Sequence, residues 1–262
     1  MMRLFRLQLA MTVFGYFQQS QFAKFMDKII IFIFIIFTPA ISMANESVNI
    51  GQEVYEQYCI GCHGEKGDGN GKAARLLVVK PRNFTTGVFK FKSTPQGALP
   101  ADDDLMRAIT NGLPGSSMPS YILVPEGERR GVIEYIKIFS KRWLNERPSS
   151  SVNIPPVPEY IGLPESIIKG SKVYKDNGCD VCHGDKGDGK GVNADELEDM
   201  WGNAVKPRNF KRGIYRCGSK PKDIFRTLAT GVEGTPMPAF SDILEEERWH
   251  LISFLLSLKV GK

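Results

Sequence analysis

Two motifs carry the residues of this chain that are best suited to covalent and metal chemistry. They read Cys59-Ile-Gly-Cys62-His63 and Cys179-Asp-Val-Cys182-His183. The two thiols of such a motif can bond to the two vinyl groups of one haem, and the adjacent histidine can bind the iron. A single copy could be a chance match or a redox dithiol. Because the motif occurs twice, each time before a glycine-rich tail, the sequence predicts two covalently bound haem c groups, with His63 and His183 as iron ligands.

The second axial ligand of each iron must come from elsewhere in the chain, because a haem iron takes one ligand on each face. The chain has three histidines, so His250 alone remains after the two motifs and cannot serve both irons. A Met-Pro pair lies at nearly the same distance downstream of each motif. Methionine often only fills space in a core, but the repeated position favours ligation. We expect Met118 and Met237 to be the second ligands.

The rest of the chain repeats around these motifs. Lys80-Pro-Arg-Asn-Phe84 returns as Lys206-Pro-Arg-Asn-Phe210, and the second copy has six extra residues before this motif, around Glu196 to Trp201. A Pro- and Ser-rich run at 147–158 separates the copies and predicts an extended linker. The predicted organisation is a leader at 1–44, a first domain at 45–147, a linker at 148–165 and a second domain at 166–262.

Apolar residues at helical spacing predict an all-α fold. The expected helices are 47–59, 102–111 and 126–139 in the first copy, and 166–179, 221–230 and 245–258 in the second. Asp102 and Pro221 begin two of these segments, and Gly112 and Gly231 follow the same two, as is typical of helix starts and stops. We find no convincing alternating strand pattern.

The N-terminal 44 residues have the parts of a secretory signal peptide. A basic flank precedes nine apolar residues, Ile29 to Phe37, and a cleavage site with the small residues Ser42 and Ala44 follows. We therefore expect cleavage after Ala44 and a periplasmic or otherwise exported protein. Met26 is a possible true start. The apolar run is shorter than the roughly 20 residues of a membrane span, so membrane contact is expected only if this segment is retained as an anchor. Its removal lowers the formal net charge from +5 to +2, which gives no case for nucleic-acid binding.

The motif, a Gly-x-x-x-Tyr before it, the Met-Pro loop and a closing helix with an aromatic residue resemble class I cytochrome c. The tandem arrangement resembles the dihaem members of exported bacterial electron-transfer chains. The resemblance implies that the first and last helices of each domain cross, at Gly51, Tyr55 and Tyr135 in one domain and at Gly170, Tyr174 and Phe254 in the other. It also implies that the carbonyls of Pro81 and Pro207 accept a hydrogen bond from the motif histidines. Arg82 and Arg208 would pair with the haem propionates.

Two further residues stand outside the repeat. His250 falls in the last helix and aligns with Gly131 of the first copy. We interpret it as a surface or hydrogen-bonded histidine rather than a redox or proton-transfer group. Cys217 matches the apolar Phe91, so a buried structural thiol is expected. An intermolecular disulfide or an iron-ligand role for Cys217 stays open.

Two irons with histidine and methionine ligands would leave no open coordination position, which favours electron transfer over catalysis. We therefore expect an electron-transfer protein rather than an enzyme, acting with redox partner proteins as a free carrier or as the cytochrome subunit of an oxidoreductase. One alternative is a dihaem enzyme, a peroxidase or a sulfur-compound oxidase, with one catalytic haem. Another is a docking module in which one haem only stabilises the fold.

Overall fold

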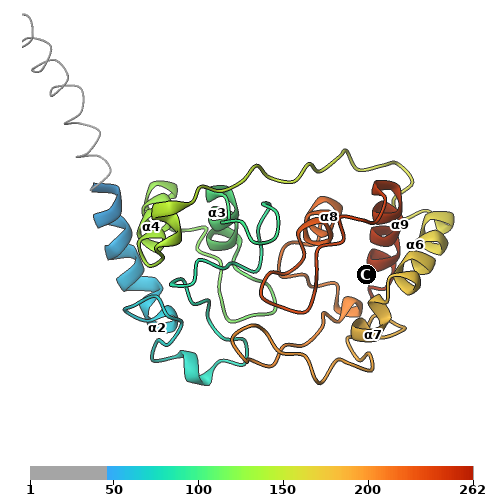
Figure 1. Ribbon diagram of the computed structural model, residues 1–262, viewed down its shortest axis with the longest axis horizontal. Helices are drawn as coiled ribbons and strands as arrows, with labels where there is room; N and C mark the ends of the chain where they lie inside the picture. Colours follow the sequence, from blue (N-terminus) through green and yellow to red (C-terminus); the bar gives the residue numbers. More distant parts are fainter. Residues whose placement is uncertain (1–45, 262) are drawn as a thin grey trace, which may run out of the picture. The chain divides into compact units, whose positions relative to one another are not determined.

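The computed structural model describes residues 46–261, and this part of the chain is helical (Figure 1). Its only β-type pairing is an isolated bridge between Glu198 and Ala204. The prediction of an all-α fold is therefore confirmed. The predicted signal peptide at 1–44, with its possible start at Met26, lies outside the described residues.

From Ile50 onward, both copies of the repeat lie in one compact unit, Ile50–Lys262, and they contain corresponding helices. The first copy has a helix over 46–58, then α2 (Ile60–His63), α3 (Asp102–Asn111), α4 (Glu126–Ile138) and α5 (Arg142–Asn145). The second copy has α6 (Pro164–Asp176), α7 (Cys179–His183), α8 (Pro221–Thr230) and α9 (Glu245–Ser257). All six expected helices are present, with ends within three residues of the predicted ones.

The first and last helices of each copy cross at a glycine, as the family resemblance implies. A Cβ atom added at Gly51 would overlap the Gly131 carbonyl of α4, so only glycine allows this close approach. Beside the crossing, the rings of Tyr55 and Tyr135 pack with centroids 5.3 Å apart. The same arrangement recurs in the second copy with Gly170, His250, Tyr174 and Phe254. These crossings fix where the haem motif emerges from the first helix.

The 147–158 segment, predicted as part of the linker, forms neither helix nor strand, and it contacts both domains. The Val152 amide donates to the Ser93 carbonyl at 2.7 Å. Val152 and Ile154 pack against the hydrophobic core of the second copy. The linker therefore contacts both halves of the protein.

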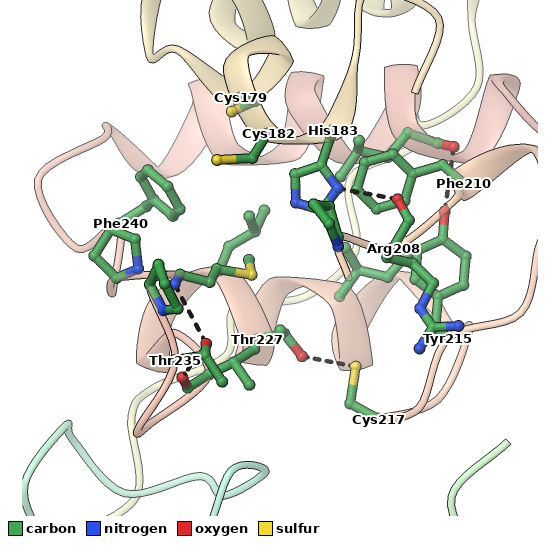
Figure 2. Close-up of a pocket in the computed structure, with 18 of the residues that line it drawn as sticks. Cys179, Cys182, His183, Arg208, Phe210, Tyr215, Cys217, Thr227, Thr235 and Phe240 are labelled. Atoms are coloured by element: carbon green, nitrogen blue, oxygen red, sulfur yellow. Dashed lines mark hydrogen bonds between the residues drawn. The ribbon is translucent and has the colours of Figure 1, made fainter. Parts of the chain in front are cut away.

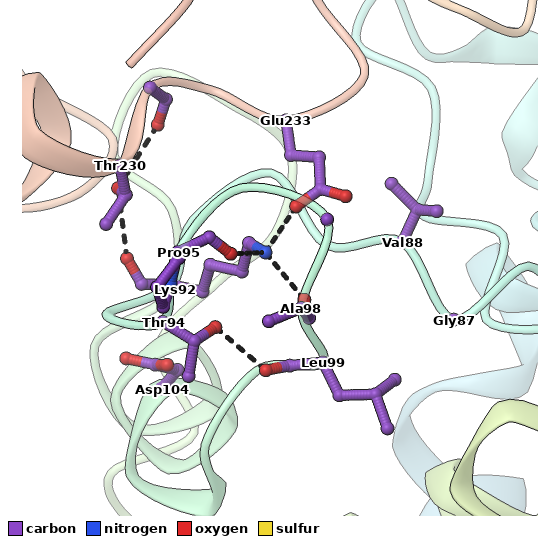
Figure 3. A network of polar contacts seen from close by, with 12 residues as sticks. Gly87, Val88, Lys92, Thr94, Pro95, Ala98, Leu99, Asp104, Thr230 and Glu233 are labelled. Atoms are coloured by element: carbon purple, nitrogen blue, oxygen red, sulfur yellow. Dashed lines mark hydrogen bonds and ion pairs between the residues drawn. The ribbon is translucent and has the colours of Figure 1, made fainter. Parts of the chain in front are cut away.

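A buried ion pair also joins the two copies (Figure 3). The Lys92 ammonium pairs with Glu233 and donates to the carbonyls of Pro95 and Ala98 at 2.6 Å each. The Thr230 hydroxyl donates to the Lys92 carbonyl at 3.3 Å. The Lys92 side chain is only 1% exposed, so its charge depends on these partners rather than on water.

Among residues 46–261, no helix has both the length and the apolar composition that crossing a bilayer requires.

Candidate haem sites

The first copy encloses an apolar cavity into which all four predicted haem-binding side chains lead. Cys59, Cys62, His63 and Met118 line it, together with apolar residues of the flanking helices. In the described part of the chain the cysteines form no disulfide, so both thiols can form thioethers. An apolar cavity with two thiols, one imidazole and one thioether is the donor set that a covalent haem needs.

The second copy encloses the equivalent cavity. Cys179, Cys182, His183 and Met237 line it, and Figure 2 shows the cysteines and the histidine of this site. The apolar lining includes Leu228, Leu251 and Leu255, which are almost fully buried. The fold therefore brings the two cysteines, the histidine and the methionine of each copy together, and each set of four lines its own cavity.

A backbone carbonyl orients each motif histidine. The Nδ1 atom of His63 lies 3.0 Å from the Arg82 oxygen, and His183 lies equally far from the Arg208 oxygen (Figure 2). A carbonyl can only accept, so Nδ1 must carry the proton and Nε2 keeps its lone pair. Burial lowers the pKa of both imidazoles, although the bond to the carbonyl opposes this shift. Both histidines are thus held as neutral rings that can bind a metal through Nε2.

The acceptor of this bond differs from the expected one by a single residue. The resemblance implied the carbonyls of Pro81 and Pro207, but these oxygens face the glycine-rich tails instead. A Cβ atom at Gly69 would lie 2.9 Å from the Pro81 oxygen, and the same holds for Gly189 and Pro207. Successive carbonyls of a non-helical chain point in different directions, so only the next one along faces the histidine.

The Lys-Pro-Arg-Asn-Phe motif also supplies an aromatic contact that sequence reasoning missed. Phe84 stacks on His63 with centroids 4.4 Å apart and planes 15° apart, and Phe210 stacks on His183 at 4.5 Å. The repeated phenylalanine in the motif was the available signal. One short segment therefore fixes the imidazole both by a hydrogen bond and by stacking.

Each methionine lies in a loop that is closed by hydrogen bonds. The Met118 carbonyl accepts from the Leu113 amide at 3.1 Å, and the Met118 amide donates to the Ser116 hydroxyl at 3.2 Å. Met237 makes the same two bonds with Val232 and Thr235. Since both backbone groups of the methionine are held, its side chain is presented to the cavity by a defined loop.

Two family models match the chain, one in each copy of the repeat. Residues 46–136 match cytochrome c oxidase, cbb3-type, subunit III, and residues 167–259 match cytochrome c. A chain of the Kuenenia stuttgartiensis reducing HAO-like protein complex Kustc0457/Kustc0458 is 38% identical, with a TM-score of 0.78, over 80% of this chain and 96% of that one. This chain is a dihaem class I cytochrome c. Among curated proteins no sequence matches it significantly.

The two domains of this dihaem cytochrome imply two covalently bound haem c groups and a role in electron transfer. The cavities described above fit that cofactor, because each pairs two thiols with an imidazole and a thioether in apolar surroundings.

The arginines of the repeated motif lie at the boundary of the two cytochrome domains. Arg82 lines the first cavity, and burial lowers its pKa to about 10, although Asp199 opposes the shift. Arg208 lines the second cavity beside Gly115 of the first domain. Within residues 46–261 neither guanidinium forms an ion pair at salt-bridge distance. Such cations are suited to carboxylates of a bound group.

Cys217 and His250 have local partners in the structure of the cytochrome. The Thr227 hydroxyl donates to the Cys217 sulfur at 2.8 Å, and burial raises the pKa of this thiol. Cys217 also lines the second cavity. His250 is buried rather than at the surface, and its Nδ1 lies 2.9 Å from the Ser166 hydroxyl, so the alternative of a hydrogen-bonded histidine is the one that applies.

Proposed function

We propose that this cytochrome is an exported protein that passes single electrons to or from a larger oxidoreductase, as its cytochrome subunit. The similar chain named above belongs to a protein complex, which supports a subunit role over a free carrier. The predicted signal peptide supports export to the periplasm.

We assign His63 and Met118 as the iron ligands of the first site, and His183 and Met237 as those of the second. The observation that carries this assignment is that each cavity contains one histidine and one loop methionine. If these residues bound the two irons, the protein would leave no position for a substrate, which favours electron transfer over peroxidase or sulfur chemistry. Haem c supplies an iron that gains and loses one electron, and a methionine ligand raises its potential relative to two histidines.

The surrounding residues hold the ligands and exclude water. The Arg82 carbonyl and the Phe84 ring keep His63 in one orientation, which limits the rearrangement needed when the charge on the iron changes. The Arg82 and Arg208 side chains are assigned to the haem propionates, because these desolvated cations lie at the cavity walls.

Counting the methionine ligands tests the function. In the oxidised protein, the methionine-to-iron charge-transfer band should amount to two per chain by absorption and magnetic circular dichroism. A high-spin or cysteine-ligated haem would instead indicate the enzymatic alternative. Co-purification of the native protein with an oxidoreductase would support the subunit role, and its isolation as a free monomer would support a carrier. N-terminal sequencing should begin at Asn45 if the leader is cleaved as predicted.

A further inference from the structure

The second domain has a loop without a counterpart in the first, and this loop contacts the first haem site. We call residues 196–204 the insertion loop, since the six extra residues of the second copy lie here. The loop is braced internally by Asp199, whose Oδ1 atom accepts from the amides of Trp201 and Asn203 at 3.1 and 3.0 Å. Its backbone closes through the Asp199 amide and the Asn203 carbonyl, 2.9 Å apart. The loop can therefore present its side chains in fixed positions.

Two side chains of the insertion loop hold cations of the first domain. The Arg82 guanidinium lies 4.0 Å from the centre of the Trp201 ring, within the range of a cation–π contact. The other Asp199 oxygen, Oδ2, lies 2.9 Å from the Lys90 ammonium, with the Asp199 side chain only 4% exposed. Burial by itself would raise the pKa of Asp199, but the hydrogen bonds from Lys90 and the loop amides lower it by more. The pKa of Asp199 is therefore below its ordinary value, and the carboxylate stays charged.

Trp201 also packs against the methionine loop of the second site, through the Cη2 and Cζ3 atoms of its ring. A Cβ atom at Gly234 would lie 2.8 Å from the Trp201 ring, and the Met200 amide donates to the Gly234 carbonyl at 2.8 Å. Gly234 precedes Met237 by three residues. The insertion loop thus packs on the methionine loop of its own domain and extends from there to Arg82.

Both cations held by the loop border the haem sites. Arg82 lines the first cavity, and Lys90 lines the first and the second. A cation close to an iron stabilises the reduced state, because reduction adds an electron, and the effect is strong where water does not screen it. The charge that these two residues present to the first iron therefore depends on residues of the second domain.

We propose that Trp201 and Asp199 are positioning residues of the first haem site, which hold Arg82 and Lys90 from the neighbouring domain and so help to set the reduction potential of the first iron. This inference rests on the proposed haem ligands. Trp201 keeps water from Arg82 and thereby raises the potential, whereas the charge of Asp199 offsets that of Lys90 and lowers it. The two residues therefore act in opposite directions.

Spectroelectrochemical titration of the haem-loaded full chain tests this pair of effects. Trp201→Leu should lower the midpoint potential of the first site, and Asp199→Asn should raise it. Each should change the ratio of reduced to oxidised haem at a given potential by about threefold or more, equivalent to about 28 mV for one electron. Trp201→Phe should stay near the wild type, because it keeps an aromatic face below Arg82. The first site is identified as the one whose potential falls in Met118→His.

Asp176→Asn is the matched control, since it removes the same charge from an exposed ion pair with Lys172 on α6. It should leave both potentials unchanged because water screens exposed charges. If Trp201 and Asp199 only packed the domains together, both variants would admit water and lower the potential alike. A fall or no change in Asp199→Asn, with both methionine bands intact, would overturn the inference and leave the proposed function standing. A wild-type protein without two one-electron transitions would overturn the proposed function itself.

Discussion

His63 Nδ1 lies 3.0 Å from the carbonyl oxygen of Arg82, and the Arg82 side chain lies 4.0 Å from the Trp201 ring. One residue therefore connects the motif histidine of the first domain, through its backbone, to the insertion loop of the second, through its side chain. Arg82 therefore both orients His63, through its carbonyl, and supplies a positive charge beside the first haem site, through its side chain.

The stacked phenylalanine of this segment should be a major source of stability. Phe84→Ala removes a buried ring that packs on His63 and on Phe89 and Phe139, so it should lower the free energy of unfolding by about 3–5 kcal/mol. Denaturant unfolding of the haem-loaded protein measures this. Phe84→Leu keeps most of the volume and should cost less. If both variants lost the same free energy of unfolding, the space left by the missing ring would not be the cause of the destabilisation.

The loop methionines should each protect one iron from external ligands. Met118→Ala and Met237→Ala should each bind one carbon monoxide per chain at neutral pH, and the double variant should bind two, while both haems stay covalently attached. Titration of the reduced protein followed by absorption counts the bound molecules. Met106→Ala, which removes a methionine that packs against the first core, is the control and should bind none. Unchanged binding in Met237→Ala would rule out Met237 as a ligand.

The cysteines of the second motif should attach the second haem alone. Cys182→Ala should reduce attachment at that site and leave the first domain loaded, because the two cavities have separate cysteine pairs. Intact-mass measurement gives the number of haems per chain. Cys217→Ala should keep both haems, since its sulfur has a local partner in Thr227. A changed absorption spectrum of one haem in Cys217→Ala, with both haems still attached, would instead support a role of Cys217 as an iron ligand.

Removing one partner of the buried ion pair between the domains should destabilise the folded protein (Figure 3). Lys92→Met leaves the largely buried Glu233 without its cation, and the expected loss is about 3–5 kcal/mol in the free energy of unfolding. Thermal or denaturant unfolding measures it. Lys172→Met, at an exposed pair on α6, is the matched control and should change little. A double variant, Lys92→Met with Glu233→Leu, should recover part of the loss, and no recovery would contradict this account.

The sequence by itself determined the haem attachment motifs, the candidate ligands and the repeat. These follow from local spacing and from counting, since three histidines cannot supply four ligands and a methionine recurs at matching positions. Helix positions were also readable, because apolar periodicity and the helix-ending glycines Gly112 and Gly231 are local signals.

Only the tertiary structure decided which groups meet across the chain. That the Arg82 carbonyl, rather than that of Pro81, accepts from His63 depends on the direction of each peptide, which motif spacing does not specify. The contacts of the insertion loop with Arg82 and Lys90 join residues more than a hundred positions apart, as does the Lys92–Glu233 pair. Such contacts depend on how two separately cored domains pack together, and no local pattern of residues encodes that packing.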